Sequence, residues 1–264
     1  MSKRPADVDV KQSVKDMLLP KNEYRLVDDY VLQGGQTHPF AILVPGGGYY
    51  MVANFIEGVP IARQLNKQGI SAFILYYRVK KQAKFPNPTD DLARAVAYIF
   101  ANAARYGLDT SSYSIWGASA GGHLTAEFGT DNVGWRKYGL PRPGTLVLAY
   151  PVISMDRAIT HIQSHDQFIG KDASAADEAM VSVERHVSAD YPPTFIWCSD
   201  DDATVNPENT RRMTAALQAA GVPFESTVYH GVMHGAGPAT GTPAEGWIDR
   251  AVSFWKKQAE GEQR

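Results

Sequence analysis

The chain has 264 residues, enough for one large α/β domain or two small ones. Lys and Arg total 26 against 28 Asp and Glu, which gives a net charge of -2. The chain therefore lacks the broad positive field typical of nucleic-acid-binding proteins. The single cysteine, Cys198, excludes an intrachain disulfide and a Cys-x-x-Cys pair. No run approaches about 18 apolar residues and no apolar leader core follows residues 1–11, so we expect a cytoplasmic protein without membrane contact.

Short apolar runs alternate with helical segments, a pattern typical of a mostly parallel sheet with helices on both faces. The predicted strands are residues 40–44, 71–79, 113–116, 146–150, 194–198 and 224–229. The predicted helices are residues 58–68, 89–106, a segment around 124–128, 207–221 and 243–258. The fold class is therefore α/β. Because no repeat, low-complexity tract or linker interrupts the pattern, we expect one domain over residues 1–264.

Residues 154–190 break this alternation. They contain polar residues and three of the seven histidines, and they show no strand pattern. We expect this segment to lie over the sheet edge as an insertion and a candidate lid. His161 and His165 have i, i+4 spacing, but the glutamate of H-E-x-x-H is missing and the stretch is not convincingly helical, so we predict no metal site there.

The segment Gly117-Ala118-Ser119-Ala120-Gly121 is a G-x-S-x-G between a predicted strand and a predicted helix. A serine on so tight a turn is expected to adopt strained backbone geometry, with small neighbours because the two backbones approach closely. Its place at the helix N-terminus favours a developing negative charge. Without this placement the motif is equally typical of an ordinary glycine-rich turn; with it, we predict that Ser119 is a nucleophile.

A serine nucleophile needs a base and a carboxylate that orients the base, and here the carboxylate precedes the histidine in the chain. Three candidates, Asp200, Asp201 and Asp202, follow the strand that ends at Cys198. We choose Asp202 because Val205 turns the chain back toward the fold, which places that carboxylate deepest in the loop. The other two are read as solvated or capping acids.

Two histidines follow the last predicted strand. His230 lies where the strand should still be running, so we interpret it as a packed or surface strand residue. Glycines around His234 allow its loop to fold over the serine. We therefore predict that His234 is the base.

The glycine-rich segment Pro45-Gly46-Gly47-Gly48-Tyr49 follows the first predicted strand, where donors for an oxyanion are expected. We assign these donors to the amides of Gly47, Gly48 and Ala120. A phosphate-binding loop is a weaker interpretation because no G-K-S/T follows. Nearby aromatic side chains are expected to line the substrate pocket, with core packing as the alternative: Tyr49, Tyr50 and Phe168.

Two polar side chains are assigned structural roles. His123, four residues after Ser119, is expected to be a buried packing or hydrogen-bonding residue of the nucleophile helix. Arg78 lies on a strand that should be central, and a buried charge needs a partner. Asp90 or Asp91 is the expected partner.

Taken together, the motifs resemble the small bacterial carboxylesterases of the α/β-hydrolase superfamily, especially the acetyl-esterase and acetylxylan-esterase-like group related to hormone-sensitive lipase. The resemblance runs roughly from residue 41 to the C-terminus and rests on P-G-G-G-Y, Y-Y-R-V, F-P-N-P-T-D-D-L-A-R-A-V, G-A-S-A-G-G-H-L, Y-P-V-I-S, P-P-T-F-I-W, D-D-A-T-V and G-V-M-H-G. It implies a triad at Ser119, Asp202 and His234 and an oxyanion hole in the glycine loop. It also implies hydrolysis of short-chain acyl esters without a cofactor, with sugar acetates a frequent substrate and homo-oligomers common.

The chain departs from this pattern in two places. Pro45 stands where many relatives carry histidine, which leaves the backbone donors untouched. Ser199 stands where a glycine commonly precedes the aspartate loop, and the choice among the three aspartates stays open there. Two other functions remain as alternatives: a serine peptidase that cleaves short peptides, and a catalytically silent binding module, against which the intact triad motifs argue.

Overall fold

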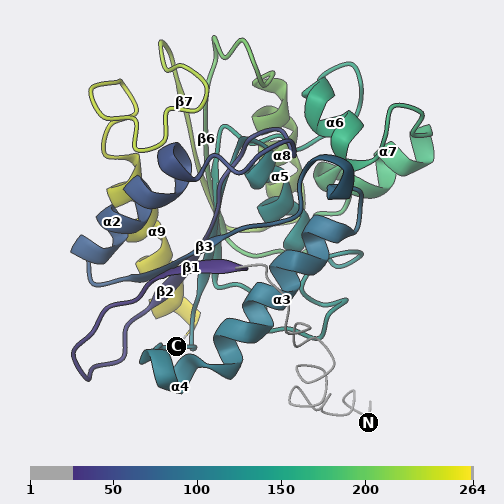
Figure 1. Ribbon diagram of the computed structural model, residues 1–264. Coiled ribbons are helices and arrows are strands. Elements are labelled where there is room, and N and C mark those ends of the chain that lie inside the picture. The colour runs from purple at the N-terminus through teal and green to yellow at the C-terminus, as the bar shows by residue number, and fades with distance from the viewer. Residues whose placement is uncertain (1–25, 263–264) are drawn as a thin grey trace.

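The computed structural model describes residues 26–262. These residues fold around a seven-stranded sheet (Figure 1). The strand order is β1-β3-β2-β4-β5-β6-β7; β1 is antiparallel to β3 and the other pairs are parallel. The mostly parallel α/β fold is thus confirmed. The strands are β1 (Val27–Tyr30), β2 (Phe40–Val44), β3 (Ser71–Leu75), β4 (Ser114–Ala118), β5 (Thr145–Ala149), β6 (Thr194–Ser199) and β7 (Phe224–Tyr229).

The helices connect these strands and cover both faces of the sheet. They are α2 (Val59–Lys67), α3 (Asn87–Ala101), α4 (Ala103–Tyr106), α5 (Ser119–Phe128), α6 (Ile162–Phe168), α7 (Ala175–Val181), α8 (Glu208–Ala219) and α9 (Trp247–Glu262). Three shorter helical turns are η1 (Asn54–Gly58), η2 (Lys80–Gln82) and η3 (Val183–Arg185).

Side chains of the central strands alternate between two cores, because successive residues of a strand point to opposite faces. In β2, Phe40, Ile42 and Val44 join the core under α3, α5 and α8. Ala41 and Leu43 join the core under α2 and α9. Figure 1 shows these two helix groups on opposite sides of the sheet. Burial on both faces explains why the central strands are continuous apolar runs.

Some predicted boundaries are wrong, each for a local reason. The strand predicted over residues 71–79 ends at Leu75, and the backbone amide of Arg78 donates to the Asp91 carboxylate (2.8 Å) instead of to a strand. The helix predicted over residues 89–106 is two helices separated at Asn102, whose side-chain amide donates to the Tyr98 carbonyl (2.8 Å). Residues 162–168 form α6, so the expectation of a non-helical stretch there is also wrong.

Of the two partners expected for Arg78, Asp90 and Asp91, Asp91 forms the close contact. The Arg78 Nε atom lies 2.8 Å from Asp91 Oδ2, and its terminal nitrogen donates to the Asn87 carbonyl (2.7 Å). Asp90 lies 4.0 Å away and is more exposed. The pair joins the loop after β3 to the start of α3.

The parallel pairing brings four loops to one edge of the sheet. β2, β4, β6 and β7 all end there, because the carboxyl ends of parallel strands meet at the same edge. The segment that contains α6 and α7 follows β5 and lies beside these loops (Figure 1). Every catalytic residue predicted above lies in one of the four loops or at the start of α5.

No helix within residues 26–262 has the length and apolar character needed to cross a membrane. The prediction that no leader core follows residues 1–11 lies outside the described residues.

Glu127 is a buried carboxyl group near the end of α5, the helix that begins at Ser119. Its Oε2 atom accepts a hydrogen bond from Thr89 Oγ1 (2.7 Å). Burial raises its pKa to about 8, although the Thr89 hydrogen bond and the charge of Lys137 oppose the shift. The folded protein therefore keeps a proton on Glu127 at pH values where the unfolded chain has released it.

This raised pKa predicts the pH dependence of stability. Between the ordinary glutamate pKa and about 8, the folded state binds more protons than the unfolded state, so stability falls as the pH rises. Glu127→Gln should remove this slope and stabilise the protein at pH 8 relative to wild type by roughly 2–4 kcal/mol. Urea unfolding of both proteins at pH 5, 6.5 and 8 measures the difference, with the exposed Glu260→Gln as control. Equal pH slopes in wild type and Glu127→Gln would contradict it.

Candidate active site

Ser119 occupies the sharp turn between β4 and α5. Its φ of 53° is in the left-handed region, which agrees with the strain expected for a serine on this turn. Close backbone contact explains the small neighbours: a Cβ atom at Gly121 would lie 2.0 Å from the Val44 carbonyl oxygen. Only glycine fits there, so α5 can begin directly at the end of the strand.

His234 lies in the loop after β7 and contacts both other predicted triad residues. Its Nε2 atom lies 2.8 Å from Ser119 Oγ, and its Nδ1 atom lies 2.7 Å from Asp202 Oδ2. The structure therefore brings together the serine, histidine and aspartate chosen from the sequence. The geometry suits transfer of the serine proton to an imidazole that a carboxylate orients.

Asp202 is the buried member of the three neighbouring aspartates. Its side chain is 1% exposed, and its Oδ1 atom accepts the backbone amides of Thr204 (2.8 Å) and Val205 (3.0 Å). Burial alone would raise the pKa of Asp202, but the hydrogen bonds from His234 and these amides outweigh burial and lower it. The carboxylate thus stays ionised beside His234.

The glycine loop after β2 lies against the nucleophile. A Cβ atom at Gly46 would lie 2.8 Å from Ser119 Cβ, so the two backbones are in close contact. Gly47 and Gly48 have φ values of 118° and 63°. Within residues 26–262 the amides of Gly47 and Gly48 have no hydrogen-bond partner, as donors awaiting an oxyanion would. Ala120 is fully buried at the start of α5.

Glu57 is a buried residue that bonds to the glycine loop, and it is not among the site residues predicted from the sequence. Its Oε2 atom accepts the Gly46 amide (2.6 Å), and its Oε1 atom accepts the Tyr150 hydroxyl (2.9 Å). Burial raises the pKa of Glu57, and these two hydrogen bonds and the charge of His234 oppose the shift. The available signal was one acid in the apolar stretch N-F-I-E-G-V-P-I-A, which needs a buried partner.

Tyr150, which directly follows β5, connects Glu57 to the histidine loop. Its hydroxyl accepts the Gly237 amide (3.1 Å), and its ring packs against the His234 ring with a centroid separation of 5.0 Å. Glu57 and Tyr150 therefore link the oxyanion loop to the loop of the base through buried hydrogen bonds.

Two of the three aromatic residues predicted to line the substrate pocket do not do so. Tyr49 and Phe168 are fully buried, and their rings stack with a centroid separation of 4.6 Å. The Tyr49 hydroxyl bonds to His123 Nδ1 (2.8 Å), and His123 Nε2 bonds to the Val181 carbonyl (2.9 Å). This corrects the prediction: core packing, the alternative, holds for Tyr49 and Phe168. His123 is buried and hydrogen-bonded, as expected, and burial lowers its pKa to about 4.

Tyr50 is exposed, so its predicted contact with substrate remains a prediction. It lies at a groove of ≈ 840 Å³. The charged side chains that share this groove are Lys80, Lys81, Lys84, Asp166 and Lys171.

His230 takes a surface position beyond β7, consistent with its assigned role. Its Nδ1 atom lies 2.7 Å from Asp200 Oδ1, and the hydrogen bond and charge of Asp200 raise its pKa. Together with Asp201, this pair forms the group within residues 26–262 whose spacing could hold a metal ion. All three side chains are exposed, and Asp201 already accepts the Ser199 hydroxyl (2.5 Å) and the Gly231 amide (3.0 Å).

Comparison with known proteins gives a consistent family assignment. Residues 28–136 match the family model BD-FAE. The solved structure of an acetyl ester-xyloside bifunctional hydrolase from Caldicellulosiruptor lactoaceticus superposes with a TM-score of 0.81 at 31% identity, covering 91% of this chain and 90% of that chain.

Two curated relatives are similar in sequence but much longer. Endo-1,4-beta-xylanase B of Butyrivibrio fibrisolvens is 32% identical over 218 residues, which are 78% of this chain and 34% of that protein. The acetylxylan esterase of Xylanibacter ruminicola is 32% identical over 205 residues, which are 75% of this chain and 41% of that protein. The chain thus spans between a third and a half of the length of these relatives.

The Glu57 contacts predict a measurable effect on the nucleophile. Glu57→Ala would leave the Gly46 amide and the Tyr150 hydroxyl without their buried acceptor, so the glycine loop should lose its fixed position. We expect labelling of Ser119 by a fluorophosphonate probe to slow about tenfold to a hundredfold.

Glu57→Gln is the matched variant for this prediction. Its amide oxygen can still accept the hydrogen bond from the Gly46 amide, but its NH2 group cannot accept the one from the Tyr150 hydroxyl, so its labelling rate should lie between those of Glu57→Ala and wild type. A folded Glu57→Ala protein that is labelled at the wild-type rate would show that the loop does not depend on this carboxylate.

Proposed function

Since the chain belongs to the acetyl-esterase and acetylxylan-esterase-like carboxylesterases of the α/β-hydrolase superfamily, we propose that it hydrolyses short-chain acyl esters through an acyl-enzyme on Ser119. The observation that carries this proposal is the single imidazole of His234, which bonds to Ser119 Oγ on one side and to Asp202 on the other. An uncharged serine is a weak nucleophile, and this imidazole is the base that activates it.

In the first half of the proposed reaction, Ser119 Oγ attacks the ester carbonyl carbon while His234 Nε2 takes the hydroxyl proton. The amides of Gly47, Gly48 and Ala120 hold the oxygen on which negative charge develops, and the N-terminus of α5 adds its dipole. When the tetrahedral intermediate collapses, the imidazolium gives its proton to the leaving alcohol. The acyl group then remains on Ser119.

In the second half, water replaces the alcohol. His234 takes a proton from the attacking water molecule, and the same amides hold the second oxyanion. Collapse releases the carboxylic acid and returns the proton to Ser119 Oγ. Throughout, Asp202 stays ionised and stabilises the imidazolium, because its hydrogen bonds keep its pKa low.

We propose acetyl groups on sugars as the substrate class. Two relatives support this choice by their names, an acetylxylan esterase and an acetyl ester-xyloside bifunctional hydrolase. We expect kcat/KM for p-nitrophenyl esters to fall as the acyl chain lengthens from acetate.

Removing the nucleophile tests the mechanism. Ser119→Ala should abolish hydrolysis of p-nitrophenyl acetate, a loss of about 10⁴-fold or more in kcat, because no acyl-enzyme can form. Full activity in this variant would contradict the proposed mechanism.

The aspartate loop offers a matched pair of variants. Asp202→Asn should lower kcat by about 10²–10⁴-fold, since an amide neither fixes the required imidazole tautomer nor stabilises its positive charge. Asp200→Asn is the control: it makes the same chemical change two residues away, on an exposed side chain that contacts His230. Equal losses in both variants would argue against Asp202 as the orienting residue.

A further inference from the structure

Two side chains at the start of α6 lie against the proposed oxyanion loop. A Cβ atom at Gly48 would lie 3.4 Å from His161 Cε1 and 3.2 Å from Gln163 Cδ. His161 is half-buried and Gln163 is exposed. Neither residue takes part in the triad or in the oxyanion hole, and within residues 26–262 the His161 Nε2 atom and the Gln163 side-chain amide have no hydrogen-bond partner.

The His161 ring has a fixed orientation. Its Nδ1 atom bonds to the hydroxyl of the buried Ser164 (2.8 Å). Its Nε2 atom has no hydrogen-bond partner within residues 26–262. Burial lowers the pKa of His161, the charge of His234 lowers it further, and Asp202 opposes both effects. Burial therefore favours the neutral form of the ring.

The position of His161 relative to the triad indicates which half of the ester it would meet. The residues directly before it, 158–160, line a hollow together with Asp202, Ala203 and Thr204, and the Ile159 carbonyl accepts a hydrogen bond from Asn209 Nδ2 (3.1 Å). His161 therefore follows a segment that lies against the Asp202 loop, on the His234 side of the candidate site. His234 must return its proton to the leaving alcohol, and the alcohol half of the ester therefore lies on that same side.

We propose that His161 and Gln163 form a subsite that binds hydroxyl groups on the alcohol half of the ester. A neutral imidazole bonded to a serine hydroxyl can adopt either tautomer, so Nε2 can donate to or accept from a ligand hydroxyl. The Gln163 amide also offers a donor and an acceptor. Neither side chain is charged, so the subsite suits a polyhydroxylated alcohol. This inference rests on the proposed function and names its alcohol as sugar-like.

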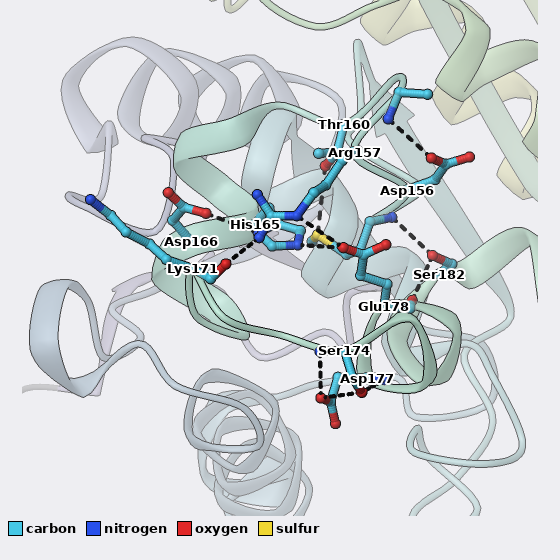
Figure 2. A network of polar contacts seen from close by, with 12 residues as sticks. Asp156, Arg157, Thr160, His165, Asp166, Lys171, Ser174, Asp177, Glu178 and Ser182 are labelled. Carbon is cyan, nitrogen blue, oxygen red and sulfur yellow. Dashed lines mark hydrogen bonds and ion pairs between the residues drawn. The ribbon is translucent and has the colours of Figure 1, made fainter.

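A polar network holds the subsite in place (Figure 2). His165, fully buried on α6, lies 3.0 Å from Asp166 Oδ1 and 3.1 Å from Glu178 Oε1 on α7. Arg157 Nε lies 3.2 Å from the same Glu178 oxygen, and the Arg157 guanidinium also donates to the Lys171 carbonyl. Because these contacts hold the backbone of α6 before substrate binds, little backbone entropy is lost on binding.

Two small esters measure how much the hydroxyl groups of the alcohol contribute to kcat/KM. Glycerol 1-acetate and propyl acetate have the same carbon skeleton, and only the first carries free hydroxyl groups. We expect wild type to have the higher kcat/KM for glycerol 1-acetate. His161→Phe and Gln163→Leu should each lower the ratio of the two kcat/KM values by about threefold to tenfold, the effect of one lost hydrogen bond.

Gln167→Leu is the matched control, because it makes the same change one turn further along α6, and its ratio should equal that of wild type. A wild-type ratio near one would overturn the subsite. Losses of kcat/KM that are equal for both esters in His161→Phe and Gln163→Leu would also overturn it. That result would mean that the two side chains support the fold or the triad and do not bind the hydroxyl groups.

Failure of the proposed function gives a different result. If wild type hydrolyses neither these esters nor p-nitrophenyl acetate, the esterase proposal fails. Binding of glycerol 1-acetate is then followed by saturation-transfer NMR, which needs no turnover. A weaker signal with His161→Phe than with wild type and Gln167→Leu would still support the subsite. Equal signals in all three proteins would overturn it.

Discussion

The geometry of the candidate active site depends on one close backbone contact, where α5 begins at the end of β4. Gly121 lies so near the Val44 carbonyl that no side chain fits between them. This contact lets the chain turn at Ser119 with a positive φ, which presents the hydroxyl beyond the sheet and the amide of Ala120 beside it. The same contact places the glycine loop after β2 next to the nucleophile. One steric constraint thus positions the proposed nucleophile and the proposed oxyanion donors together.

Buried hydrogen bonds connect the glycine loop to other loops of the candidate site. Glu57 accepts the Gly46 amide on one oxygen and the Tyr150 hydroxyl on the other, and Tyr150 in turn accepts the Gly237 amide. A buried carboxylate without such partners would cost several kcal/mol. Because each partner comes from a different loop, the requirement for hydrogen bonds fixes the three loops relative to one another. The buried hydrogen bonds of Glu57 and Tyr150 therefore help to position the glycine loop and the His234 loop.

The sequence predicts the parts of the site that depend on local chain geometry. Ser119 lies in a motif whose glycines are dictated by the turn, and Asp202 and His234 follow strands that an apolar pattern identifies. Contacts between distant residues leave no such pattern. Glu57 is one acid in an apolar stretch, and nothing in the sequence pairs it with Tyr150. Tyr49 is adjacent to the glycine loop, but its hydroxyl is satisfied by His123 inside the core.

The same distinction applies to the fold. Central strands buried on both faces are continuous apolar runs and were predicted, whereas β1, a partly exposed antiparallel strand of four residues, was not. Helix α6 was missed because tertiary contacts hold it: His165 is buried between carboxylates from two helices, which a helical hydrophobic pattern cannot encode. In this protein the residues proposed to carry out acyl transfer come from strand ends with recognisable motifs. The residues that would select the alcohol come from an inserted segment that polar contacts, rather than a motif, hold in place.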